Sequence, residues 1–65
     1  MIDIASLTEI DRGRWVSYRG KQEGRIKDWN DRFIHVVYQC GDQWDKFYRY
    51  TAAPTLPEDL EFIPL

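Results

Sequence analysis

Aromatic and basic side chains alternate in one short stretch of this chain, and this is the first place where its residues could do chemistry. The aromatic residues of that stretch, which we predict to bind a protein partner, are Trp44, Phe47, Tyr48 and Tyr50. Lys46 and Arg49 lie among them. Such mixtures form hot spots in protein interfaces, and they also stack nucleic-acid bases. The alternative is that Phe47, or the pair Tyr48 and Tyr50 on the other face of the same strand, belongs to the core.

Trp44 differs from its neighbours because it follows a Gly-Asp-Gln loop. No strand pattern requires this side chain inside. We therefore expect Trp44 to be exposed and to contact a partner or a second subunit, since a bare apolar surface is unfavourable in water.

A second candidate surface is a run of basic residues. The formal net charge is −2, yet all nine Lys and Arg residues lie between positions 12 and 49. The predicted phosphate-contacting stripe comprises Arg12, Arg14, Arg19, Lys21, Arg25 and Lys27. Such a cationic patch would suit nucleic acid, with Tyr48 or Tyr50 stacking on a base. The alternative is an ordinary solvated strand face.

Residues for catalysis or metal binding form no recognisable arrangement. We expect His35 in the middle of a strand as a structural or surface residue, and Cys40 as a passive thiol at a strand end. A structural zinc site needs about four Cys or His ligands, and these two are the only candidates. Glu58 and Asp59 fit the first turn of a short helix rather than a catalytic pair. We therefore predict no catalytic residue, no metal, no cofactor and no enzymatic activity.

The composition also bears on where the protein works. A single cysteine excludes an internal disulfide, which small secreted domains usually contain. The N-terminus lacks the features of a signal peptide, and no apolar run approaches the roughly 20 residues of a membrane span. We expect an intracellular protein with no membrane partner.

Five short segments have the alternation, or the β-branched and aromatic content, that is typical of strands. They span residues 14–19, 23–29, 32–39, 47–51 and 61–63. Asn30 and Asp31 mark a tight turn that makes a hairpin of the second and third segments. Gly24 predicts a bulge or a close backbone approach. Pro54 should end the fourth strand, because proline cannot donate to a ladder.

Two helical turns complete the expected elements. Residues 6–11 fit one turn, with Ser6 as the N-cap and Glu9 in the capping-box position. Residues 56–60 fit a single 3-10 turn, with Pro57 at its first helical position. We therefore predict an all-β fold, a five-stranded Src-homology-3-like small barrel with a single 3-10 turn before the last strand. It forms one domain, residues 1–65, with an N-terminal extension over 1–11 and the barrel over 12–65.

Four motifs cover most of the chain after residue 12. They read Gly-Arg-Trp-Val-Ser-Tyr at 13–18, Glu-Gly-Arg-Ile-Lys-Asp-Trp-Asn-Asp at 23–31, Phe-Ile-His-Val-Val-Tyr at 33–38 and Pro-Glu-Asp-Leu at 57–60. This set resembles very short proteins encoded by bacteriophages and prophages, and its turn and strands also resemble KOW and Tudor-type barrels. The resemblance implies a phage origin, a Src-homology-3-like fold and a location in the cytoplasm of the bacterial host. It implies no particular activity.

Two further motifs are Gly-x-Ile-x-x-Trp at 24–29 and Leu-Glu-x-Ile at 60–63. They resemble the plasmid-type dihydrofolate reductases, small chains that assemble as tetramers around a shared pore. That family lines its pore with a Val-Gln-Ile-Tyr segment, which corresponds here to Phe-Tyr-Arg-Tyr at 47–50. Only the tyrosine matches and the glutamine is missing, so no catalytic residue is carried over.

These observations favour a small non-enzymatic binding module. The leading hypothesis is that it binds a host or phage protein and modulates host machinery or defence. A nucleic-acid-binding KOW-like barrel is the first alternative, and a dihydrofolate reductase the second. We also predict a homodimer with Trp44 near the contact, because the strand at 32–39 is apolar on both faces and each face needs a cover. Closure of the barrel could supply that cover instead.

Overall fold

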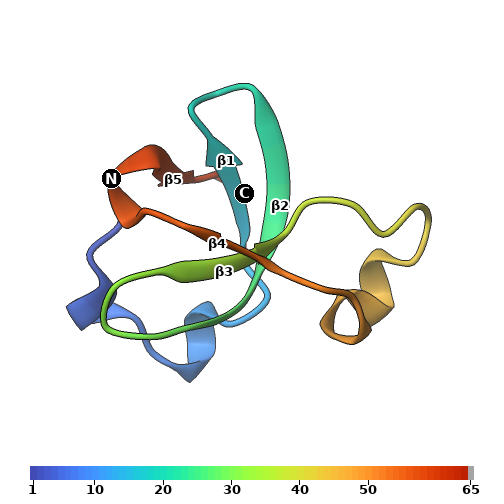
Figure 1. The fold of residues 1–65 in the computed structure, drawn as a ribbon, viewed down its shortest axis with the longest axis horizontal. Coiled ribbons are helices and arrows are strands. Elements are labelled where there is room, and N and C mark those ends of the chain that lie inside the picture. The colour runs from blue at the N-terminus through green and yellow to red at the C-terminus, as the bar shows by residue number, and fades with distance from the viewer. Residues whose placement is uncertain (65) are drawn as a thin grey trace.

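The computed structural model describes residues 1–64, which form one antiparallel sheet joined by loops and short 3-10 helices (Figure 1). The five strands are β1 (Trp15–Tyr18), β2 (Gln22–Trp29), β3 (Ile34–Val37), β4 (Ala53–Thr55) and β5 (Leu60–Phe62). The 3-10 helices are η1 (Ile4–Ser6), η2 (Glu9–Asp11), η3 (Trp44–Arg49) and η4 (Pro57–Asp59). The prediction of a mainly β protein is confirmed.

The strands lie in the order β4-β3-β2-β1-β5, and each neighbouring pair is antiparallel. Strand β2 is the longest and lies at the centre of the sheet, while β4 and β5 are its edges. Within residues 1–64 no pairing joins β4 to β5, so the sheet stays open and does not close into a barrel.

The main core fills one face of the sheet. Its fully buried members, which come from four of the strands, are Val16, Ile26, Ile34, Val36 and Leu60. Alternation along the strands turns these side chains to the same side. Ile2 joins them from the N-terminal segment, and its N–H donates to the Pro57 carbonyl over 3.0 Å. The segment expected as an extension therefore packs on the core.

A second, smaller core lies on the opposite face of the sheet. Trp15, Arg25 and Val37 occupy matching positions on β1, β2 and β3, so they point to the same side. Helix η3 covers this row, with Phe47 packed against Val37 and Cys40. The chain itself therefore covers both faces of β3. The homodimer stays a prediction, but an uncovered face of β3 is no longer a reason to expect it.

The fourth predicted strand, residues 47–51, is wrong. This segment forms the end of η3 and the turn after it, and β4 lies further along the chain. Trp44 and Phe47 lie on either side of a kink at Lys46 in η3 and both pack in the second core, whereas a strand would place them on opposite faces of the sheet. Pro54 does not end a strand either. It lies inside β4, where an edge position tolerates a residue without an N–H.

The helical turn predicted over residues 6–11 is also corrected. The chain forms η1 and η2 instead, and at η1 the Asp3 carboxylate accepts a hydrogen bond from the Ala5 N–H over 3.1 Å. At η2 the Thr8 N–H donates to the Asp11 carboxylate over 3.0 Å, so Thr8 is the cap in place of Ser6. The turn predicted before the last strand is confirmed as η4. Within residues 1–64, no helix has the length and apolar character needed to cross a bilayer.

The predicted tight turn between β2 and β3 is confirmed. The Asn30 side chain accepts hydrogen bonds from the N–H groups of Arg32 and Phe33, at 2.8 and 2.7 Å. These bonds satisfy backbone N–H groups that have no strand partner within the turn. The second and third predicted segments therefore form the expected hairpin.

Gly24 marks a close approach between the backbones of β2 and β3. A β-carbon there would lie 2.6 Å from the Val37 carbonyl oxygen and 2.7 Å from the Val36 side chain. The shift in register occurs between Ile26 and Asp28, so the bulge lies beyond this glycine. Of the two explanations that the sequence leaves open, the close approach is the correct one.

We expect Gly24→Ala to lower the free energy of unfolding by about 1–3 kcal/mol, because the new methyl group overpacks a rigid backbone contact. Gly20→Ala is the matched control, since its methyl group would meet nothing within 4 Å and only the φ of +71° opposes it. Urea unfolding of both variants measures the difference. A Gly24→Ala variant as stable as the wild type would contradict the close-approach explanation.

Candidate functional site

A groove of about 450 Å³ opens where β4 and η4 approach the β1–β2 turn. Its aromatic and apolar walls include Tyr18, Phe33, Tyr38, Pro54 and Leu56. Leu56 is 44% exposed, which leaves an apolar side chain at the rim. The groove therefore lies between β4, at one edge of the sheet, and η4, which leads into the other edge.

Ring packing and a hydrogen bond fix the aromatic wall of this groove. The rings of Tyr18 and Tyr38 meet edge to face, with their centroids 6.1 Å apart. The Tyr38 and Thr55 hydroxyls share a hydrogen bond of 2.9 Å. Burial raises the pKa of Tyr38, so its phenol keeps its proton at neutral pH. The wall is thus already formed in the free protein.

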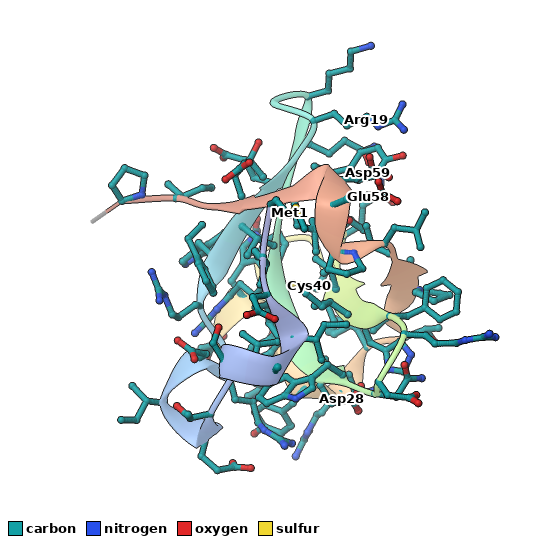
Figure 2. The ribbon with its side chains drawn as sticks, turned by 90° about the vertical axis from the view of Figure 1, so that its left-hand side faces the viewer. Met1, Arg19, Asp28, Cys40, Glu58 and Asp59 are labelled. Atoms are coloured by element: carbon teal, nitrogen blue, oxygen red, sulfur yellow. The ribbon has the colours of Figure 1, made fainter. Side chains whose placement is uncertain are left out.

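An ion pair lies at the rim of the groove. Arg19 Nε donates to Asp59 Oδ1 over 3.1 Å, and the Arg19 backbone N–H donates to the Asp59 carbonyl over 3.0 Å. The hydrogen bond and the carboxylate charge raise the pKa of Arg19. Glu58 lies at the same corner of the molecule (Figure 2). Arg19 has a φ of 52°, in the left-handed region that non-glycine residues seldom adopt.

The four aromatic residues that the sequence singles out differ in how far they are buried. Phe47 is buried, and Trp44 is half-buried with its ring centroid 4.6 Å from that of Trp15. The expectation of an exposed Trp44 is wrong, because Trp15 points to the same side of the sheet and the two rings cover each other. Tyr48 and Tyr50 stay 55% and 37% exposed. A role for these residues in protein binding stays a prediction.

Arg25 is held in place by both its hydrogen bonds and its aromatic neighbours. Its Nε donates to the Gly13 carbonyl over 2.7 Å, and its Nη1 to the Trp44 carbonyl over 2.8 Å. Its guanidinium carbon lies 5.6 Å from the Trp15 ring centre and 4.4 Å from that of Phe47. Because two of its N–H groups donate to backbone carbonyls and two rings lie near its guanidinium, this side chain is a structural bridge between Gly13 and Trp44.

The other members of the predicted basic stripe also have partners, with one exception. Arg12 pairs with Glu9 and Arg14 with Asp11, each over 3.1 Å, as Arg19 does with Asp59. Lys27 Nζ donates to the Tyr50 carbonyl over 3.0 Å. Lys21 is exposed and makes no such contact within residues 1–64. The structure therefore distributes these cations among local partners and does not gather them into one free surface.

His35 and Cys40 lie apart from the groove walls. His35 Nδ1 contacts the Asp28 carboxylate across the β2–β3 pair. Cys40 is buried, and burial raises the pKa of its thiol. Across residues 1–64, no group of three or more His, Cys, Asp or Glu side chains is placed to hold a metal ion.

No sequence motif marks the groove as a site. Tyr18 and Tyr38 occupy strand positions at which a core role is the usual interpretation. The one local signal is Pro-Thr-Leu-Pro at 54–57, which places apolar residues in a connection that is ordinarily polar. That signal indicates an apolar surface but not the aromatic wall opposite it.

Comparison with family models, curated proteins and solved structures gives no match to this chain. Its function is therefore argued from the groove and its surroundings.

We expect Arg25→Lys to lower the free energy of unfolding by about 1.5–3 kcal/mol, because a lysine cannot bond both carbonyls while it stacks on the rings. Arg32→Lys, the same change at an exposed arginine, should stay within about 0.5 kcal/mol of the wild type. Urea unfolding followed by tryptophan fluorescence measures both. Similar midpoints for the two variants would show that Arg25 is not the bridge described here.

We expect the Cys40 thiol to react slowly with Ellman's reagent in the native protein, because burial both shields the thiol and keeps it protonated. In denaturing urea the same thiol should react at the rate of a free cysteine. Absorbance at pH 8 follows the released thiolate in both conditions. Equal rates would mean that Cys40 is accessible in the folded state.

Proposed function

We propose that this chain is a small non-enzymatic interaction module, encoded by a phage or prophage, that binds a segment of a host or phage protein in the groove. The observation that supports this most is a preformed aromatic wall with an exposed leucine, Leu56, at the rim. Rigid walls lose little freedom on binding, and aromatic pockets with apolar rims suit protein side chains. Binding of this kind in the bacterial cytoplasm would modify host machinery or defence without any catalytic step.

We assign the fold to the Src-homology-3-like barrel class as part of this proposal. The order β4-β3-β2-β1-β5, with the 3-10 helix η4 just before β5, supports the assignment. The groove lies between β4, one edge strand, and η4, which leads into the other edge strand β5. A partner segment placed there would cover apolar surface that the sheet leaves exposed.

Nucleic-acid binding is the weaker alternative. It requires cations that are free to contact phosphates. Five members of the predicted stripe instead have intramolecular partners, namely Arg12, Arg14, Arg19, Arg25 and Lys27. The exposed Tyr48 and Tyr50 keep this alternative open, because each ring could stack on a base.

The reductase alternative has less support. It depends on a strand at 47–50 to line a pore, and this segment belongs to η3 and the turn after it. The matched tyrosine, Tyr50, has its backbone carbonyl bonded to Lys27. We therefore propose no folate chemistry.

The proposal is tested by affinity capture from bacterial lysate with three tagged baits. We expect the wild type and Ile10→Glu to recover the same protein, and Leu56→Glu to recover about tenfold less of it, because a buried charge at a hot spot opposes binding. Ile10 is the matched control, since it is 87% exposed and lies outside the groove. Thermal unfolding checks that all three baits are folded.

Equal capture by all three baits would contradict the groove as the binding surface. Sedimentation of the purified baits separates capture from self-association. A dimer of the wild type that Leu56→Glu dissociates would mean that the groove binds a second copy of this chain.

A further inference from the structure

Among the described residues that line the groove, Asp59 supplies the one carboxylate, and none is a lysine or an arginine. Glu58 adds an exposed carboxylate at the same corner, next to the half-buried carboxylate of Asp59 (Figure 2). Within residues 1–64, Asp59 Oδ1 is hydrogen-bonded to Arg19, whereas no hydrogen bond reaches Oδ2. The rim therefore suits a positively charged group, and one carboxylate oxygen is free to bind it.

Arg19 already makes the contacts that such a group would make. Its Nε lies 3.1 Å from the Asp59 carboxylate, and its guanidinium carbon lies 5.6 Å from the centre of the Tyr18 ring. An arginine from a partner would use the same carboxylate and the same ring face, through a charge-assisted hydrogen bond and a cation–π contact.

We propose that the groove binds a partner segment through a lysine or arginine side chain, and that Arg19 occupies this cation position in the free protein. The inference rests on the proposed protein-binding function and adds the chemistry of the partner. In the complex, the partner's cation replaces Arg19 on Asp59, and apolar neighbours in the segment contact Leu56 and Pro54.

Arg19 is held loosely enough to be replaced. Its side chain is 61% exposed, so water and salt screen the ion pair. Arg25 provides the contrast, because two carbonyls and two rings hold its guanidinium. The backbone does not require an arginine at position 19 either. Its φ of 52° is a conformation that glycine adopts without strain.

The test uses three acetylated, amidated tripeptides, Leu-Arg-Leu, Leu-Gln-Leu and Leu-Glu-Leu, titrated into the full chain and followed by amide chemical shifts. We expect Leu-Arg-Leu to bind more tightly than the other two, with saturable shifts at Tyr18, Leu56 and Asp59. Arg19→Gly should tighten Leu-Arg-Leu binding about two- to fivefold, because it removes the competing cation, and should leave Leu-Gln-Leu unchanged. Asp59→Asn should abolish the preference for Leu-Arg-Leu.

The glycine variant keeps the test interpretable, since it favours the native turn and so stays folded. Weaker binding of Leu-Arg-Leu to Arg19→Gly would overturn the inference, because Arg19 would then belong to the binding surface. Equal binding of all three tripeptides would overturn the cation preference and leave the groove as a protein-binding site. If no tripeptide shifts the groove resonances, the inference fails, and the capture experiment decides the proposed function separately.

Discussion

The bridge made by Arg25 is the interaction on which the rest of this sheet depends. Arg25 lies on the central strand β2, opposite Trp15 on one side and Val37 on the other. Its guanidinium bonds the Gly13 and Trp44 carbonyls, so one side chain ties the segment before β1 to helix η3. A domain of this size buries only about 60% of the surface that its unfolded chain exposes. Without η3 in place, the second face of the sheet would lie open to water.

Holding η3 on the second face has a consequence for function. It buries Phe47 and partly buries Trp44, and it uses Arg25 and Lys27 as donors to backbone carbonyls. These residues belong to the two binding surfaces that the sequence suggests, and here they serve stability. Figure 1 shows η3 at one end of the molecule and the chain around η4 at the other. The groove lies at the η4 end, where Tyr18 and Tyr38 pack partly against the main core and also line the groove.

The sequence predicts the elements that depend on local pattern. Alternation of side chains identifies β1 and β2. The turn at Asn30 fixes the hairpin that β2 forms with β3. The aromatic run at 47–51 leads to the wrong prediction of a strand. Alternating rings fit a strand, and a spacing of three residues fits a 3-10 helix equally well. No local sequence pattern predicts the groove. Tyr18 lies on β1, Tyr38 follows β3 and Asp59 ends η4, so only the tertiary fold brings the three together at the groove.

Arg19 and Arg25 show why residue type alone does not assign a role. Arg19 follows β1 and Arg25 lies on β2, but both guanidinium groups lie near an aromatic ring and both residues belong to the same predicted stripe. The difference is in what surrounds each guanidinium. The Arg25 guanidinium donates to two carbonyls, and its loss would expose η3 to water. The Arg19 guanidinium is bonded to one carboxylate, and its side chain is mostly exposed to solvent. An exposed ion pair of that kind contributes little to stability, so it can be exchanged for an equivalent pair with a partner at little cost to the fold.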